Sequence, residues 1–261
     1  MKLLLLTLLF AASELAAPAQ APKIEPGVSH DLAVWRAAHY SDIRYKLGLT
    51  LEKMSPVLKG TLEIRVNVAG SVPPAVAGGA VPPIILDWVR VADREKDSSI
   101  SNVTLNGKLL KMVGPSDPII SHGEPQGVYL LDDEHLYFST GVILGENIIK
   151  LDLTSPITTG DSTITRKISE TVGLDLTTPT LASSSTVKRY IEKKDGSEYV
   201  YSLFTHGNVS TAFPSFDQPD LKARFLLLLT APADWQVVSN TVSLELIGGP
   251  IPKGLLCSPH S

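Results

Sequence analysis

The sequence contains very little cysteine. Among its 261 residues there is a single one, Cys257, so no disulfide can form within the chain. Cys257 lies in an irregular stretch with no chemical partner nearby, and a free thiol is the simplest interpretation. The stability of the fold must therefore come from the burial of apolar side chains.

The net charge of the chain is small, and aromatic residues are few. The net charge is −4, and aromatic residues make up 6% of the chain. A nucleic-acid-binding protein is expected to carry a basic face, and single-strand binders add aromatic platforms for stacking. Neither is apparent, so we expect no nucleic-acid partner.

Long apolar runs are confined to the first residues. Lys2 gives a positive start, residues 3–12 are mostly apolar but too few to span a bilayer, and Ala17-Pro18-Ala19 offers a cleavage site. We interpret residues 1–19 as a signal peptide, with an uncleaved membrane anchor as the alternative. The chain is then expected to be exported, periplasmic or secreted, with no membrane span after signal removal.

The histidines lack the spacing of a zinc peptidase. Such a site needs two histidines four residues apart on a helix, with a glutamate between them as general base. No two of the six histidines stand four apart: His30, His39, His122, His135, His206 and His260. Glu134-His135 shows the dipeptide reversed, and we expect it at the surface. We predict no catalytic residue and no metal ligand in this chain, which argues against an enzyme.

Strand patterns fill most of the remaining sequence. Short runs rich in β-branched residues recur between turn signals, and no long stretch follows a helical period. The expected strands cover residues 43–51, 61–68, 84–87, 100–108, 136–138, 147–153, 186–192 and 198–204. This pattern predicts an all-β fold, an antiparallel sandwich or saddle-shaped domain.

Turn residues separate these strands. Ser55-Pro56 and Lys59-Gly60 are expected to form the first turn, and Asn106-Gly107 and Asp195-Gly196 are typical of hairpins. Residues 71–83 are expected to form a surface loop. Residues 154–186 are expected to form an insertion loop, with a short helix near 166–171.

One stretch stands out from the strand pattern. From Phe213 to Phe225 it reads Phe-Pro-Ser-Phe-Asp-Gln-Pro-Asp-Leu-Lys-Ala-Arg-Phe. Asp217 is expected to cap a short helical turn, in whose first positions Pro219 is tolerated. Residues 225–230 are apolar on both faces, as in a strand covered on both sides, and residues 235–240 are expected to return beside them. The stretch therefore predicts a structural corner and hairpin.

The same stretch resembles the end of the N-terminal domain in aminopeptidase N-like zinc peptidases. There the pattern reads roughly Phe-Pro-Cys-Phe-Asp-Glu-Pro-x-x-Lys-Ala-x-Phe. The shared positions form a structural motif: Phe213, Pro214, Phe216, Asp217, Pro219, Lys222 and Phe225. Ser215 and Gln218 replace the family's cysteine and glutamate. The resemblance extends over roughly residues 38–241.

The resemblance carries implications for the site. In that family the domain closes one side of a peptidase cleft, and a Gln-x-Glu pair before the motif holds the substrate's amino group. The equivalent positions here are Leu203 and Thr205, which supply neither an amide nor a carboxylate. We therefore expect no substrate-binding residue. Zinc belongs to the family's catalytic domain, so no cofactor is expected in this chain.

These observations give a domain division and a function. We expect a signal peptide at 1–19, a linker at 20–37, the β domain at 38–245 and an irregular tail at 246–261, from a truncated or frameshifted longer gene. The expected function is that of the non-catalytic N-terminal domain of an exported zinc aminopeptidase. Its partner would be the peptidase domain of the parent protein or a complementing chain. Peptide substrates would contact this domain only through that partner.

A stand-alone exported β-sandwich that binds peptides or proteins is the alternative function. The two functions predict different surfaces. A solitary binding module should cover its surface with polar residues, whereas a domain separated from its neighbour should expose an apolar patch.

Overall fold

The computed structural model describes residues 22–70, 81–91, 94–113, 134–159, 185–205 and 207–240, and the backbone alone of 127–131. The predicted signal peptide, the predicted helix near 166–171, the predicted tail at 246–261 and Cys257 lie outside the described residues. Among the described residues, no helix is long and apolar enough to cross a membrane.

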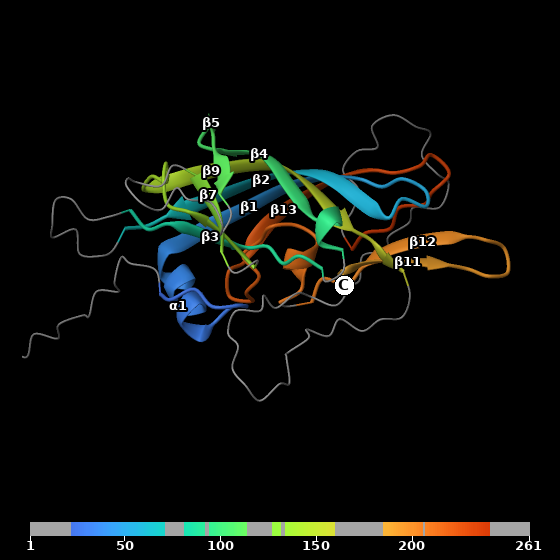
Figure 1. Cartoon of the computed structure of the whole chain (residues 1–261), viewed down its shortest axis with the longest axis horizontal. Helices are drawn as coiled ribbons and strands as arrows, with labels where there is room; N and C mark the ends of the chain where they lie inside the picture. The colour runs from blue at the N-terminus through green and yellow to red at the C-terminus, as the bar shows by residue number, and fades with distance from the viewer. Residues whose placement is uncertain are drawn as a thin grey trace, which may run out of the picture.

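The described strands form three sheets (Figure 1). The largest has the order β13-β1-β2-β9-β4-β5, and its members are β1 (Tyr40–Thr50), β2 (Val57–Val68), β4 (Ser99–Leu105), β5 (Lys108–Leu109), β9 (Gly145–Pro156) and β13 (Ala223–Thr230). The second has the order β3-β8-β7-β6, with β3 (Ile84–Asp87), β6 (Lys111–Val113), β7 (Gly127–Leu131) and β8 (His135–Phe138). The third consists of β10 (Thr158–Thr159), β11 (Val187–Ile191) and β12 (Glu198–Ser202).

The predicted all-β fold is confirmed. Most neighbouring strands are antiparallel, as the hairpin signals indicated, including the long β2–β9 pair. Three pairs are parallel, namely β1 with β13, β6 with β7, and β10 with β11. Parallel neighbours need a crossover connection, so the sequence pattern of local hairpins could not indicate them.

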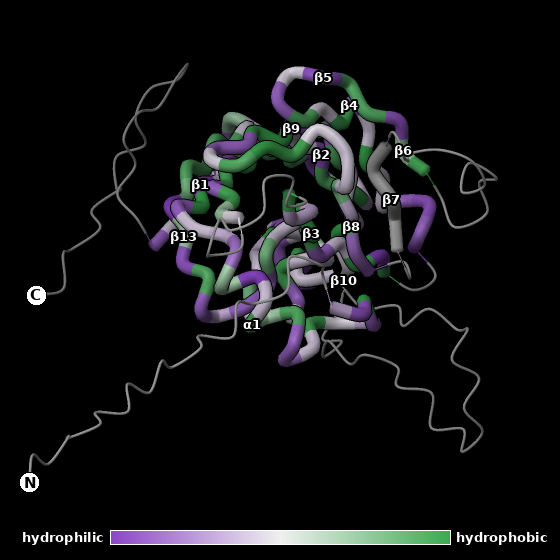
Figure 2. Tube along the Cα trace, turned by 90° about the vertical axis from the view of Figure 1, so that its left-hand side faces the viewer, coloured by the Kyte–Doolittle hydropathy of each residue, from purple (hydrophilic) through white to green (hydrophobic). Residues whose placement is uncertain are grey.

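The main core lies between the two larger sheets. Alternate residues of β2 point inward, and Leu62, Ile64 and Val66 are at most 2% exposed. They belong to one hydrophobic cluster with Ile84 and Phe138 of the four-stranded sheet. Figure 2 shows the large sheet arching over the smaller one.

A helix occupies part of the range predicted to be a linker. Helix α1 (His30–His39) begins after Ser29, whose hydroxyl accepts the N–H of Leu32 at 3.2 Å. Leu32 and Trp35 are buried in the main core. A helix of this length shows too few turns for a clear apolar period, and its burial depends on sheets formed by later residues. Two short 3-10 helices, η1 (Glu95–Asp97) and η3 (Val209–Thr211), complete the described elements.

The turn predictions at Asn106-Gly107 and Asp195-Gly196 are confirmed, and the first turn is confirmed at Ser55-Pro56, which lie between β1 and β2. Gly107 and Gly196 adopt positive φ angles of 82° and 74° in the predicted hairpin turns. Lys59 and Gly60, however, lie inside β2 rather than in a turn. Gly60 allows close strand approach instead, because a Cβ there would lie 2.6 Å from the carbonyl oxygen of Gly48.

The prediction that residues 225–230 are covered on both sides is wrong. Phe225, Leu226, Leu227 and Leu228 are 43–49% exposed on β13, which lies at the edge of the large sheet. The predicted return of residues 235–240 is also not found, because these residues form no strand. Apolar composition indicates what a strand could bury, but neighbouring strands decide what it does bury.

Candidate functional site

The Phe-Pro motif is fastened to β3 and β1 by backbone hydrogen bonds. Ser215 and Asp87 form an isolated antiparallel bridge, in which the Ser215 N–H donates over 3.0 Å and its carbonyl accepts over 2.7 Å. One residue later, the N–H of Phe216 donates to the Tyr45 hydroxyl at 3.0 Å. Burial raises the pKa of Tyr45 well above its ordinary value, so this hydroxyl stays neutral. The predicted structural corner is therefore built onto two sheets at once.

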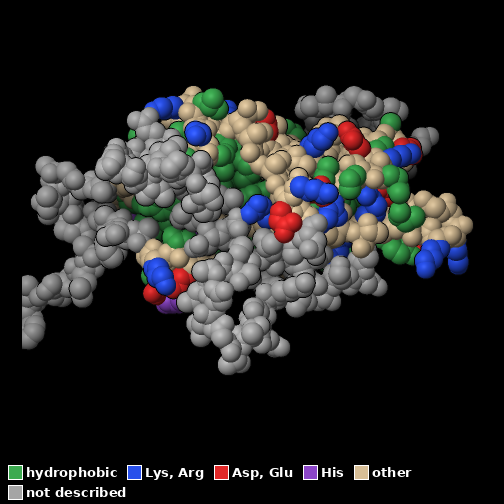
Figure 3. Space-filling view, in the orientation of Figure 1, with side chains coloured by type: hydrophobic (Ala, Val, Ile, Leu, Met, Phe, Trp, Pro, Cys, Tyr) green, Lys and Arg blue, Asp and Glu red, His purple; other side chains and the backbone are tan. Residues whose placement is uncertain are grey.

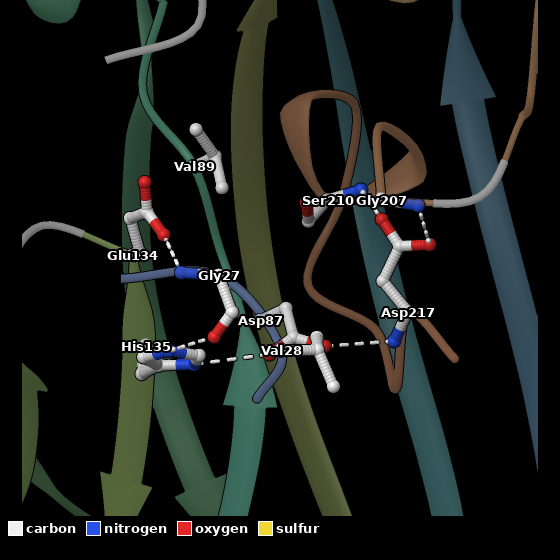
Figure 4. A pocket seen from close by; sticks show the side chains of 9 residues that line it. All are labelled: Gly27, Val28, Asp87, Val89, Glu134, His135, Gly207, Ser210 and Asp217. Atoms are coloured by element: carbon white, nitrogen blue, oxygen red, sulfur yellow. Dashed lines mark hydrogen bonds and ion pairs between the residues drawn. The ribbon is translucent and has the colours of Figure 1, made fainter. Parts of the chain in front are cut away.

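A buried polar cluster lies behind this corner, centred on the Asp87 carboxylate. The Arg36 guanidinium donates to both carboxylate oxygens, over 2.9 and 2.7 Å. His135 Nδ1 lies 2.9 Å from Asp87 Oδ1, and the Asp217 N–H donates to Oδ2 over 2.8 Å. The side chains of Arg36, Asp87 and His135 are at most 4% exposed. Four distant chain segments thus meet at one carboxylate, and Figure 4 shows three of them.

The charge of Asp87 is stabilised by its partners. Burial alone would raise the pKa of this carboxyl, but the Arg36 charge, together with hydrogen bonds from His135 and Arg36, lowers the pKa to about 2. Asp87 is therefore ionised at neutral pH. A buried ion pair of this kind is costly to break, because removing one partner leaves the other charge without compensation.

Asp217 holds a different part of the chain from the one predicted. Its carboxylate accepts the N–H groups of Gly207 at 2.9 Å and Ser210 at 3.2 Å, which precede it in the chain. The expected helical turn after Asp217 is absent, since residues 217–220 form no helix. Burial raises the pKa of Asp217, and these two backbone hydrogen bonds offset only part of that effect. Asp217 thus closes the loop that leads into the motif.

The expectation that Glu134-His135 lies at the surface is wrong. Both residues are at most 1% exposed. The His135 Nε2 lies 3.0 Å from the carbonyl of Glu25 and 3.1 Å from that of Gly27, and the Gly27 N–H donates to Glu134. This pair therefore fixes the segment before α1 against the smaller sheet. Its burial depends on Asp87 and on the N-terminal segment, which no local pattern around His135 could reveal.

The cluster does not have the arrangement of a hydrolytic site. Ser215 could supply a hydroxyl nucleophile beside an Asp-His pair, but both nitrogens of His135 already face the Asp87 carboxylate or backbone carbonyls. The cavity at this place measures about 10 Å³, room for one water molecule at most. The arrangement is suited to holding chain segments together rather than to binding a substrate.

Metal binding finds no support in the part of the chain that the structure describes. No group of three or more His, Cys, Asp or Glu side chains is placed there so as to hold a metal ion. At the centre of the cluster, the Arg36 guanidinium occupies the position beside Asp87 that a cation would take. The positive charge is thus supplied by the protein itself.

The structure separates the motif residues into two groups. Phe213, Pro214, Phe216 and Asp217 are buried, whereas Pro219, Lys222 and Phe225 are exposed. The sequence found the motif through its resemblance, but it missed Arg36, Asp87 and His135, the residues that hold the motif from behind. Their positions are far apart in the chain, and none belongs to a recognisable pattern.

Leu203 and Thr205 lie in the exposed segment after β12. The Leu203 N–H donates to the Thr186 carbonyl over 2.9 Å, and the Leu203 side chain is 47% exposed. Neither side chain presents a carboxylate to an ammonium group.

Residues 149–245 match the family model described as the peptidase M1 N-terminal domain. The chain carries a peptidase M1 N-terminal domain. The match includes most of β9, the β11–β12 hairpin, the Phe-Pro motif and β13. The buried cluster connects the matched residues, through Asp217, to Asp87 and Arg36, which precede the match.

Individual proteins match part of the chain. Aminopeptidase N of Streptomyces lividans is 41% identical over 51 residues, which make up 20% of this chain and 6% of that protein. Leukotriene A4 hydrolase of Saccharomyces cerevisiae matches in structure at 13% identity and a TM-score of 0.47, covering 83% of this chain and 26% of the hydrolase. The yeast enzyme in complex with bestatin gives a TM-score of 0.44 at the same identity and coverage. The M1 domain described here thus spans a minor part of each relative's length.

Proposed function

We propose that this chain is the non-catalytic N-terminal domain of an exported zinc aminopeptidase and that it packs against a peptidase domain. The observation that supports this proposal is an exposed aromatic surface on the β11–β12 hairpin. We define the aromatic surface as three tyrosines and an adjoining leucine, Tyr190, Tyr199, Tyr201 and Leu203, which are 42–54% exposed. Figure 3 shows hydrophobic side chains gathered at this end of the molecule.

The geometry of the hairpin makes this surface continuous. Tyr190 and Tyr199 face each other across the two strands, with their ring centres 6.1 Å apart. Tyr201 and Leu203 follow Tyr199 at the two-residue spacing that keeps side chains on one face of a strand. A contiguous apolar surface of this kind is typical of a protein–protein contact. It is also what we expected of a domain adapted to a neighbouring domain.

The aromatic surface is joined to the Phe-Pro motif. The ring of Phe204 lies 5.7 Å from that of Phe213, in an edge-to-face arrangement. Phe213 is buried and lies close to the cluster residue Asp217 in the chain. The motif and its cluster therefore support the loop that carries Leu203 and Thr205, the segment that the family resemblance assigns to the substrate side.

A division of labour follows for the proposed assembly. The peptidase domain would supply the zinc ion, the general base and most peptide contacts. This chain would supply a rigid wall, because its polar groups are engaged in holding segments together and because Leu203 and Thr205 supply no carboxylate for a substrate ammonium group. Peptides would meet this chain only through its partner.

The test is binding to a zinc-loaded M1 peptidase domain that has been expressed without its own N-terminal domain. Titration calorimetry should detect a complex with this chain, and aminoacyl-anilide turnover should depend on the peptidase domain. The double variant Tyr199→Glu, Tyr201→Glu should weaken binding at least tenfold. Leu109→Glu, at an exposed position on β5, serves as the matched control and should bind normally.

Two results would contradict the proposal. Zinc-dependent turnover by this chain alone would make it an enzyme. Absence of binding to a peptidase domain of verified zinc content, combined with capture of free peptides by this chain, would favour a stand-alone binding module instead.

A further inference from the structure

Strand β13 has an open edge in the part of the chain that the structure describes. It pairs on one side with β1, in a parallel register that runs from Ala223 to Thr230 without interruption. The Thr230 carbonyl accepts the Leu51 N–H over 2.9 Å, so the backbone groups of Thr230 and of alternate residues before it face β1. The N–H and C=O groups of Phe225, Leu227 and Leu229 therefore point away from β1, where no other described strand pairs with β13.

Both faces of this open strand are apolar. Phe225 and Leu227 stand beside Tyr45 and Leu47 of β1, so they extend the core face of the sheet. Leu226 and Leu228 lie on the opposite face, and all four β13 side chains are 43–49% exposed. The hydrophobic layer on the core face thus continues to the edge of the sheet and ends there half-covered.

The usual protection of a sheet edge is absent from β13. Natural edge strands are blunted by charges, proline, a bulge or a short length. Here the strand has eight residues and a regular register, and its only charged side chain is Arg224, which pairs with Asp42. An edge of this kind is a template for another strand.

We propose that the open edge of β13 pairs with β13 of a second copy of this chain, antiparallel and around a two-fold axis at Leu227. Because outward-pointing residues pair with outward-pointing residues, Leu227 lies opposite Leu227 of the second copy. Phe225 then lies opposite Leu229 of the second copy, and the reverse pair follows by symmetry. The large sheets of the two copies become one continuous sheet.

The second copy is favoured because the occupant must be apolar on both of its faces. Of the other edge strands in the described sheets, β5, β6 and β10 have two or three residues, and β3 is already bridged to Ser215. Strand β12 alternates tyrosine with polar residues and valine, which suits one apolar face only. Among these edge strands, only β13 is long enough and apolar on both faces, which is what a partner strand for β13 needs.

Charge and symmetry also fit a pair of β13 strands. In this register Arg224, already neutralised by Asp42, lies opposite Thr230 of the second copy, so no like charges meet. The contact uses the same patch on both copies and is therefore closed, giving a dimer and not a filament. This dimer is independent of the proposed packing against a peptidase domain, which is measured with different variants.

Site-specific cross-linking tests both the dimer and its register. In a Cys257→Ser background, Leu227→Cys should form a disulfide-linked dimer under mild oxidation, because opposite residues have Cα atoms about 5.5 Å apart. Phe225→Cys alone and Leu229→Cys alone should not, since each meets its own copy about 14 Å away along the strand. An equimolar mixture of these two variants should cross-link to about half the extent of Leu227→Cys, because only half of the randomly formed dimers contain one copy of each variant.

Sedimentation velocity of the unmodified chain gives the second measurement. We expect a concentration-dependent dimer, converted to monomer by Leu227→Lys with unchanged circular dichroism, and unaffected by Leu109→Lys on β5. A chain that is monomeric at all concentrations, or that forms open-ended oligomers, would overturn the proposal. So would equal cross-linking by Leu227→Cys and Phe225→Cys. The cysteine variants keep the test decisive even where lysine at Leu227 prevents folding.

Discussion

Substitution of Asp87 by asparagine tests the role of the buried cluster most directly. The change keeps the side chain's size but removes the negative charge that Arg36 and His135 face at 2.7–2.9 Å. Arg36 is fully buried, so its guanidinium would remain in the interior without an anion. Breaking a buried ion pair in this way typically costs about 3–5 kcal/mol.

That cost is large compared with the stability of an ordinary domain, which is about 5–15 kcal/mol. With a urea m-value of about 2–3 kcal/mol/M, the unfolding midpoint should fall by about 1–2.5 M. The assay is equilibrium urea unfolding of the full chain, followed by tryptophan fluorescence and circular dichroism. Coincident transitions with an unchanged m-value would show that the folded state is still compact.

Asp42→Asn is the matched control. Asp42 also pairs with two arginines, Arg44 and Arg224, but it lies at the surface, where solvent screens the interaction. Its loss should move the midpoint only slightly. If Asp87→Asn shifts the midpoint no further than Asp42→Asn does, the cluster does not hold the fold together.

A double variant separates the ion pair from simple packing. Arg36→Met with Asp87→Leu removes both charges and leaves apolar side chains of similar volume. Because replacing a complete buried pair avoids an isolated charge, much of the stability lost in Asp87→Asn should return. An additive loss in the double variant would contradict the coupling that the structure shows.

The remaining predictions concern pH, strand approach and the motif. The folded-state pKa of Asp87 is about 2, below its ordinary value of 3.8, so ionised Asp87 contributes about 2 kcal/mol to stability above pH 4, and this contribution is lost as the pH falls toward 2. Urea midpoints measured from pH 5 to pH 2 should show this loss of stability. In Asp87→Asn the midpoint should depend less on pH over the same range. Gly60→Ala should lower the thermal unfolding temperature more than Gly196→Ala does. A Cβ at position 60 would lie 2.6 Å from a backbone oxygen, whereas position 196 has open space and only an unfavourable φ of 74°. The opposite order of destabilisation would contradict the close approach of the strands at Gly60. Phe213→Ala should cost about 3–5 kcal/mol by the same urea assay, and a cost below about 1 kcal/mol would mean that this ring is not a core residue.

Much of the fold was predictable because it depends on local alternation. The spacing in residues 61–68 gives an apolar face wherever the strand lies, and Leu62, Ile64 and Val66 are indeed buried. The turns at Gly107 and Gly196 were equally predictable, since positive φ is a property of the backbone that glycine accepts without cost. Helix α1 was missed because ten residues give a weak period and its burial depends on distant strands.

The site was predictable only in part. The motif from Phe213 to Phe225 could be found in the sequence, and its structural role is seen in the hydrogen bonds that join it to Asp87 and Tyr45. Its support could not be found, because Arg36, Asp87 and His135 come from a helix and two strands that meet only in the folded chain. Asp217 was identified as a capping residue, yet it binds backbone donors before it rather than after it.

The scarcity of cysteine determined from the start that this chain relies on burial, and local patterns determined most of its strands. Tertiary structure alone decided which apolar residues are buried. Both β2 and β13 consist of residues that favour strands. Among the described strands, however, β2 has a neighbour on each side and β13 has one neighbour only. Burial depends on long-range strand order, and that order is set by parallel pairings such as β1 with β13, which join residues about 180 positions apart in the chain.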